Sequence, residues 1–253
     1  MTVPLLANEM FRMTRKPTTS AKAVARLIDH AVLSPTEGDN ELREQIALLS
    51  AWPIASFCVK PSMIPLAAAL LEGSESVVST VIGFPHGGTL PQVKGYECEQ
   101  AFSLGAREVD MVINLGKALE GDWAAVSRDI EAVLVATRHN KGILKVIFET
   151  GLLPSESKIQ LCKLCSELEV DFVKTSTGFG FTKGSDGGYD STGATDADLQ
   201  LMRQHTAASI GVKASGGIRD LQSLLHATEL GVSRIGTSST LKILKEAEER
   251  FGS

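Results

Sequence analysis

The chain has little of what would direct a protein to nucleic acid or to a membrane. Lys and Arg number 25 against 30 Asp and Glu, a formal net charge of −5, so the surface as a whole does not attract polyanions. No uninterrupted apolar run approaches the length of a membrane span. Residues 1–19 carry Arg12, Arg15 and Lys16 but no sustained apolar core, which argues against a signal peptide. We therefore expect neither nucleic acid nor membrane as a partner, and local positive charge must hold any anionic ligand.

Cysteine and histidine are also sparse. Among the 4 cysteines, Cys162 and Cys165 have the CxxC spacing, but they lie in a helical pattern without a second pair or a flanking histidine. The 5 histidines show no paired ligand spacing, so the sequence predicts no metal site. Thiols without a disulfide framework are typical of the reducing cytoplasm, where we expect the protein to be.

The chain does have a regular alternation of short β-branched runs with longer segments of helical period. The pattern repeats about eight times, the number that closes a (β/α)8 barrel. We predict an α/β, single-domain TIM barrel over residues 20–253 after a short N-terminal extension, residues 1–19. A doubly wound open sheet is the alternative. The expected strands are 27–33, 55–60, 76–84, 108–114, 143–149, 171–177, 211–217 and 234–238. The expected helices are 40–50, 61–71, 91–104, 123–139, 155–168, 196–207, 220–229 and 239–250.

Two lysines interrupt strands that otherwise read as buried. Lys174 lies in DFVKTSTG at 171–178, and Lys213 lies in GVKASGG at 211–217. Side chains alternate between the two faces of a strand, and Val173 and Val212 suit the face that packs against helices. Both lysines are therefore expected to point into the barrel. Burying an ammonium is unfavourable unless it is paired or loses its proton.

Other ionisable side chains fall on inward positions by the same alternation. One interpretation is a buried salt-bridge network whose members only neutralise one another, although such networks contribute little to stability. The other is catalysis, because a neighbouring cation and partial desolvation lower the pKa of an amine until it can attack a carbonyl. A carboxylate in reach, such as Asp110, could then move protons. The inward set is Asp29, Asp110, Lys145, Glu149, Lys174 and Lys213.

Glycine turns end the last two expected strands. Gly216 and Gly217 close one strand, and the sequence GTSS at 236–239 closes the next and opens the last helix. Loops after strands seven and eight, with N–H groups at a helix N-terminus, are where TIM barrels hold phosphate. The alternative is that these are tight turns that need glycine only for their geometry.

A long glycine-rich loop, 178–193, follows the sixth expected strand. Such loops usually cover a ligand or are tolerated insertions, and we hypothesise that 179–193 acts as a mobile lid. His86, in GFPHG at 83–87, could reach the mouth of the site, although a turn histidine is the simpler reading. Cys58 is expected to face the interior as a buried thiol.

At these residues the chain resembles the deoxyribose-phosphate aldolases, a family of class I, Schiff-base aldolases. The matching segments span nearly the whole chain in family order. They are LIDH at 27–30, SFCVKP at 56–61, GFPHG at 83–87, EVDMVIN at 108–114, LKVIFET at 144–150, VKTSTGF at 173–179, VKASGGIR at 212–219 and RIGTSS at 234–239.

The resemblance implies reversible cleavage of 2-deoxy-D-ribose 5-phosphate into D-glyceraldehyde 3-phosphate and acetaldehyde, in deoxynucleoside catabolism and without metal or cofactor. By motif position Lys174 looks like the Schiff-base lysine, Lys213 like the lysine that lowers its pKa, and Asp110 like the proton relay. The partners are then the phosphorylated sugar and the aldehyde, with a homodimer as a possible assembly. The expected substrate contacts are Asp29, Cys58, Lys145 and Thr175, with Gly178, Gly216, Gly217, Gly236, Ser238 and Ser239 as phosphate contacts.

One departure concerns the loop after TSTGF. In the family it usually reaches GAT within a few residues, whereas residues 180–191 lengthen it here. Two other readings are open: a Schiff-base aldolase for another phosphorylated sugar, and a non-catalytic phosphosugar-binding barrel.

Overall fold

Eight parallel strands form a closed barrel. The computed structural model describes residues 20–183, 189–190 and 193–252. The strands neighbour one another in the order β1-β10-β9-β6-β5-β4-β3-β2, and every neighbouring pair is parallel. The predicted (β/α)8 fold is confirmed. The strands are β1 (Ile28–Val32), β2 (Ser56–Val59), β3 (Val77–Ile82), β4 (Glu108–Val112), β5 (Ile143–Ile147), β6 (Phe172–Lys174), β9 (Gly211–Ser215) and β10 (Arg234–Thr237).

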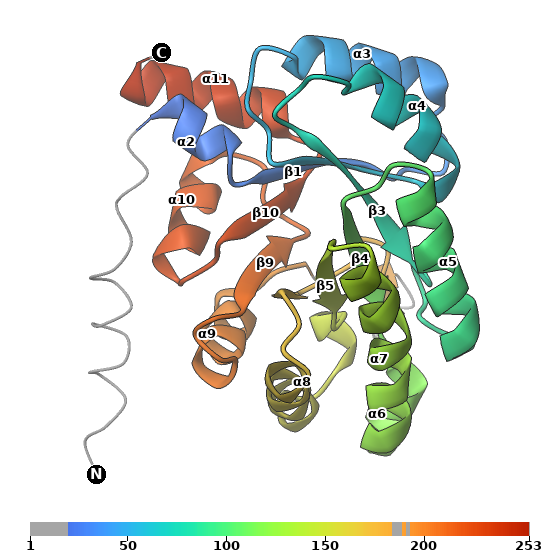
Figure 1. The fold of residues 1–253 in the computed structure, drawn as a ribbon. Coiled ribbons are helices and arrows are strands. Elements are labelled where there is room, and N and C mark those ends of the chain that lie inside the picture. The colour runs from blue at the N-terminus through green and yellow to red at the C-terminus, as the bar shows by residue number, and fades with distance from the viewer. Residues whose placement is uncertain (1–19, 184–188, 191–192, 253) are drawn as a thin grey trace.

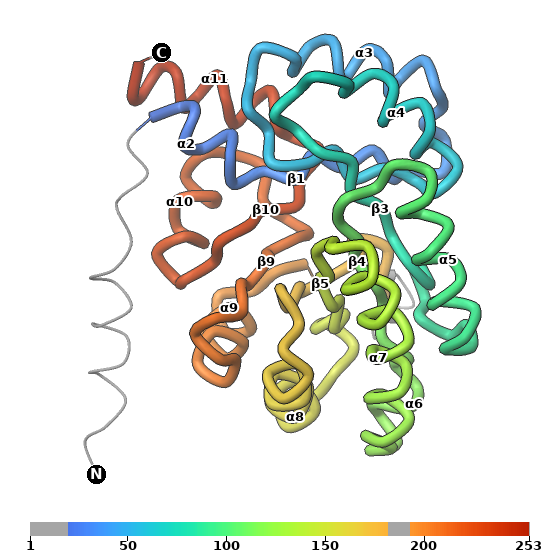
Figure 2. Tube along the Cα trace, in the orientation of Figure 1, coloured from blue at the N-terminus to red at the C-terminus, as the bar shows by residue number. Residues whose placement is uncertain are grey.

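Helices surround the barrel in chain order (Figures 1 and 2). Helix α2 packs beside α11, so the two ends of the described chain meet on one side (Figure 1). No helix in the described part of the chain is both long and apolar enough to cross a bilayer. The helices are α2 (Ala21–Ala25), α3 (Asp39–Leu49), α4 (Ile64–Leu70), α5 (Pro91–Ser103), α6 (Leu115–Glu120), α7 (Trp123–His139), α8 (Ser155–Glu167), α9 (Asp196–His205), α10 (Leu221–Glu229) and α11 (Thr240–Phe251), with 3-10 turns η1 (Pro61–Met63) and η2 (Thr150–Leu152).

The differences from the predicted elements are local. The sequence pattern does not predict α2, α6 or the 3-10 turns, because they are too short to show a period. Strand β6 ends three residues before the expected 177, since Thr175 Oγ1 binds the backbone of Ser215 and the chain then turns at Gly178, whose φ is +84°. Within the expected irregular loop, β7 (Thr182–Lys183) and β8 (Tyr189–Asp190) form an antiparallel pair.

Two predictions fall on segments that the structure does not describe. The N-terminal extension, 1–19, lies outside the described residues. The lid hypothesis rests largely on 184–188 and 191–192, which also lie outside them. Both stay predictions.

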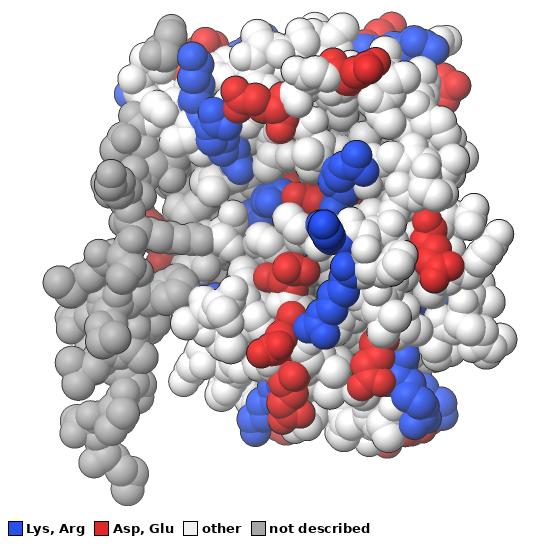
Figure 3. All heavy atoms as spheres, viewed as in Figure 1, with Lys and Arg blue, Asp and Glu red and all other residues white. Residues whose placement is uncertain are grey.

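The core lies between the strands and the surrounding helices. Val109, Met111, Val173 and Val212 are fully buried on the outward side of their strands, as the alternation predicts. Basic and acidic side chains are interspersed on the face seen in Figure 3, so neither sign forms a broad field there.

A fully buried ion pair joins the outer helices to the mouth of the barrel. Lys94 Nζ on α5 lies 2.6 Å from Asp129 Oδ2 on α7 and donates to Val112 O at 2.8 Å. The same carboxylate oxygen accepts the backbone N–H of Asn114 at 2.9 Å. The pair therefore holds α5 and α7 against the end of β4, the strand that carries Asp110.

We expect Asp129→Ala to lower the free energy of unfolding by about 3 kcal/mol, because the Lys94 ammonium would stay buried without its counter-ion. Urea titration measures the change. Glu120→Ala is the control, since it removes only one of the two carboxylate partners of the half-buried Lys117 and should leave the midpoint unchanged. Equal losses in the two variants would contradict a structural role for the buried pair.

Candidate active site

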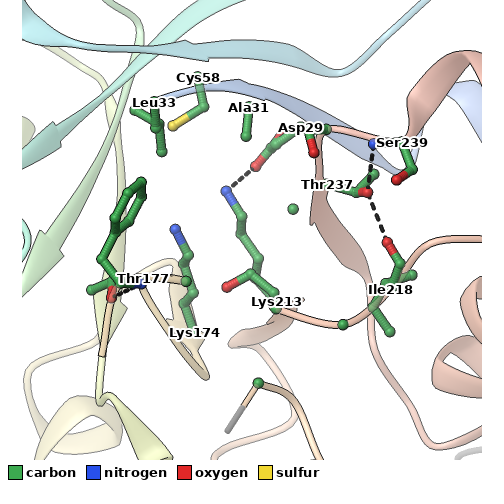
Figure 4. A pocket seen from close by; sticks show the side chains of 18 of the residues that line it. Asp29, Ala31, Leu33, Cys58, Lys174, Thr177, Lys213, Ile218, Thr237 and Ser239 are labelled. Atoms are coloured by element: carbon green, nitrogen blue, oxygen red, sulfur yellow. Dashed lines mark hydrogen bonds and ion pairs between the residues drawn. The ribbon is translucent and has the colours of Figure 1, made fainter. Parts of the chain in front are cut away.

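A cavity of about 480 Å³ opens at the carboxyl ends of the strands. This is the face on which barrels of this type carry their active sites. The side chains of Lys174 and Lys213 extend next to each other into the same space, and Cys58 lies across from them (Figure 4). The lining comes from β1 and the loop after it, from β2, and from the loops after β6, β9 and β10.

The two lysines share one carboxylate. Lys174 on β6 and Lys213 on β9 are register partners on neighbouring strands. The Nζ atom of each lies 2.7 Å from Asp110 Oδ2, at the centre of the barrel. Asp110 is fully buried and lies behind the lysines, so it reaches the cavity through their amino groups. The predicted inward direction of all three side chains is confirmed.

The environment shifts the pKa values of the two lysines in opposite directions. Burial, assisted by the Lys213 ammonium and opposed by Asp110, lowers the pKa of the Lys174 amine. Lys213 is also buried, but contacts with Asp110 and with Asp29, 2.5 Å away, raise its pKa above the usual value. Burial alone would raise the pKa of Asp110, yet the surrounding lysines hold it well below the usual range. Lys174 is therefore the amine of the pair that loses its proton more readily.

A second layer of charge lies beneath this pair. Lys145 Nζ is 2.9 Å from Asp110 Oδ1 and 2.6 Å from Glu108 Oε2. Arg234 donates to Asp29 Oδ1 at 2.6 Å and to Glu108 Oε2 at 3.1 Å. Lys145 was predicted from the sequence as an inward residue, whereas Glu108 and Arg234 were not. Strand alternation could have found both, since residues two apart on a strand point to the same face: Glu108 shares its face with Asp110, and Arg234 shares its face with Gly236.

The turns after β9 and β10 are joined to each other at one side of the cavity. Gly178, Gly216, Gly217, Gly236, Ser238 and Ser239, the residues predicted as phosphate contacts, all line the cavity. Thr237, which the prediction passed over, fixes this end by donating to Ile218 O at 2.7 Å and accepting the Ser239 N–H at 3.0 Å (Figure 4). This end of the cavity is built largely of backbone, which suits an anion.

Four predicted residues lie elsewhere. Lys145 and Thr175 do not line the cavity, since each is fully buried against other protein groups. Glu149 has a φ of +54°, which turns its carboxylate to the backbone N–H and the hydroxyl of Thr177 rather than to the lysines. His86 is exposed and outside the lining. Asp29 and Cys58 do line the cavity, and burial raises the pKa of the Cys58 thiol.

These contacts define what the site can do. An amine with a lowered pKa at the floor of a cavity can attack a carbonyl carbon and form an iminium ion. The carboxylate within hydrogen-bonding distance of its nitrogen can take up and return protons.

Known proteins of similar sequence are aldolases. Residues 23–246 match the model of the DeoC/LacD family aldolases. The chain is 43% identical over 229 residues to the deoxyribose-phosphate aldolase of Rhodopirellula baltica, covering 90% of this chain and 91% of that one. It is 45% identical over 224 residues to deoxyribose-phosphate aldolase 1 of Bacillus licheniformis, covering 88% and 96%.

Solved structures agree with the sequence relatives. The aldolase QR15 superposes with a TM-score of 0.81 at 33% identity, covering 90% of this chain and 96% of that chain. The deoxyribose phosphate aldolase of Aeropyrum pernix superposes with a TM-score of 0.79 at 28% identity, covering 89% and 91%.

A glycine contact between two loops generates a prediction. A Cβ on Gly193 would lie 2.3 Å from the backbone oxygen of Gly216, so Gly193→Ala must push the two loops apart. We expect inorganic phosphate to bind about tenfold more weakly, a loss of about 1.4 kcal/mol. Isothermal titration calorimetry measures the affinity. Gly88→Ala, where a Cβ meets nothing within 4 Å, should bind phosphate as the unchanged protein does. Unchanged affinity in Gly193→Ala would show that anions bind elsewhere.

Proposed function

Because the chain belongs to the DeoC/LacD family of aldolases, we propose that it reversibly cleaves 2-deoxy-D-ribose 5-phosphate into D-glyceraldehyde 3-phosphate and acetaldehyde. The observation that carries the proposal is the Lys174 amine at the cavity floor, 2.7 Å from the carboxylate that it shares with Lys213. This pair of amines on one carboxylate suits the formation of a Schiff base.

In the cleavage direction, the neutral Lys174 amine adds to C1 of the open-chain sugar, and the carbinolamine loses water to give an iminium ion. The C3 hydroxyl gives up its proton, the C2–C3 bond breaks, and its electron pair moves to the nitrogen as an enamine. D-Glyceraldehyde 3-phosphate leaves. The enamine takes a proton at C2, and water then hydrolyses the iminium to release acetaldehyde. Asp110 is the group beside the nitrogen that can relay protons.

The far end of the cavity takes the phosphate in this proposal. The glycine turns after β9 and β10 line it, and the second turn leads into α11, so backbone N–H groups and the helix N-terminus favour an anion. Arg219 also lines the cavity and adds local positive charge. The positive charge that the overall net charge of −5 does not provide is thus available locally.

The setting of the enzyme is also a proposal. We infer a cytoplasmic enzyme of deoxyribonucleotide catabolism, consistent with four buried cysteines that form no disulfide. A homodimer stays a prediction. The aldolase of Aeropyrum pernix has been described as a tetramer, so assemblies larger than two occur among proteins of this fold.

The first prediction from this function concerns the site of the covalent bond. Incubation with acetaldehyde and borohydride should fix a two-carbon adduct on Lys174, because it combines cavity access with a lowered pKa. Peptide mass spectrometry locates the adduct. Lys174→Ala should abolish both adduct and turnover. An adduct on another lysine, or none, would overturn the assignment.

The second concerns Lys213. Lys213→Leu removes an ammonium that disfavours protonation of Lys174, so the pKa of Lys174 should rise. An amine with a raised pKa is neutral only at higher pH. The acidic limb of the kcat/KM profile should therefore move to higher pH, with kcat/KM at pH 7 falling about a hundredfold, as expected for a shift of about two units. A profile reduced equally at every pH would contradict this role.

A further inference from the structure

The charges buried in the barrel do not balance. The cluster holds three carboxylates, Asp29, Glu108 and Asp110, against four cationic side chains, all joined by contacts of 4.0 Å or less. The cations are Lys145, Lys174, Lys213 and Arg234. With every group ionised the cluster carries one positive charge in excess. It becomes neutral when one ammonium loses its proton.

The contacts identify which cation is in excess. Lys145 lies within 4.0 Å of three carboxylates, and Lys213 and Arg234 each lie within that distance of two. Among the carboxylates that the structure describes, Lys174 contacts that of Asp110 alone, through the same oxygen atom that Lys213 contacts. Lys174 also lines the cavity, where a neutral amine can meet a ligand. The excess proton is therefore most easily lost from Lys174.

We propose that Arg234 and Glu108 are positioning residues that set the protonation of Lys174 by fixing the charge balance of the cluster. The inference rests on the proposed role of Lys174 as the Schiff-base lysine. Neither residue lines the cavity. Arg234 acts by neutralising Asp29 and Glu108, which leaves Lys213 as a full counter-charge for Asp110. Glu108 acts by offsetting Lys145.

The groups around Lys174 support this route. Asp110 on β4, Lys213 on β9 and Cys58 on β2 act on it directly. Lys145 on β5 and Asp29 on β1 act through Asp110 and Lys213. Glu149, at the end of β5, is hydrogen-bonded to Thr177. Because the cluster is buried and contiguous, removing the charge of one group changes the electrostatic energy of the others.

The test changes the charge count without touching the cavity. Arg234→Met leaves three carboxylates facing Lys145, Lys213 and Lys174, so Lys174 should hold its proton. The acidic limb of kcat/KM against pH should move up by about one unit, with about a tenfold loss at pH 7 that is recovered at high pH. Arg234→Lys keeps the charge and should keep the profile.

A double variant distinguishes an effect of the charge balance from a structural effect of the Arg234–Glu108 pair. Glu108→Gln alone removes a carboxylate and should not move the acidic limb upward. Arg234→Met combined with Glu108→Gln restores the balance, and its acidic limb should return to the original position. A merely structural pair would behave differently: the double variant would be at least as impaired as either single variant, and the loss would persist at every pH. That outcome would overturn the proposal.

Borohydride trapping with acetaldehyde distinguishes this failure from failure of the proposed function. If the unaltered protein forms no adduct on Lys174 at any pH, the Schiff-base assignment itself is wrong. If the adduct forms but Arg234→Met leaves the pH dependence of trapping unchanged, the function stands and the charge-balance proposal is overturned.

Discussion

The site depends on one carboxylate, that of Asp110. Its two oxygens contact three lysine ammonium positions, with Lys145 on one oxygen and Lys174 and Lys213 on the other. A buried carboxylate without cations, or buried lysines without this carboxylate, would carry an uncompensated charge at a cost of several kcal/mol. The lysines and the acid therefore require one another. Because the acid cannot fully compensate all three, Lys174, the one with the fewest other carboxylate partners among the described residues, loses its proton most easily.

The parallel barrel makes this arrangement possible. Asp29, Asp110 and Lys213 are far apart in sequence, yet each points inward from its own strand of a closed sheet. Alternation along each strand turns side chains of one parity into the barrel, where adjacent strands contribute to the same cluster, as Asp110 and Lys145 do. Lys174 and Lys213 come from adjacent strands and meet at the mouth, whereas Glu108 and Arg234 open their strands and fill the layer beneath. The fold thus places the ion pairs of Glu108 and Arg234 beneath the Lys174 amine.

The sequence predicted which side chains point into the barrel better than it predicted how far along the barrel axis each of them lies. The alternation of side chains correctly predicted that Lys174, Lys213 and Asp110 point into the barrel, because the face to which a strand residue points depends only on its position along that strand. It could not rank residues along the barrel axis, since depth depends on register between strands that are distant in sequence. Alternation correctly placed Lys145 inside the barrel, but the substrate contact that the family resemblance implied for it is not supported, because it contacts Asp110 and does not line the cavity. Glu149 failed for another reason, because its left-handed backbone interrupts the alternation that the prediction extended through it.

The charge balance also bears on the reaction after the Schiff base has formed. In the proposed reaction, an iminium ion returns a positive charge to the Lys174 nitrogen, in a cluster whose three carboxylates are already matched by Lys145, Lys213 and Arg234. Cleavage of the C2–C3 bond removes that charge, because the electron pair moves onto nitrogen and leaves a neutral enamine. A surrounding that disfavours charge at this nitrogen thus favours the step in which the charge disappears. Such differential stabilisation lowers the barrier to carbon–carbon cleavage. Under this proposal, the same excess of positive charge favours both the neutral Lys174 amine before attack and the movement of the electron pair onto its nitrogen during cleavage.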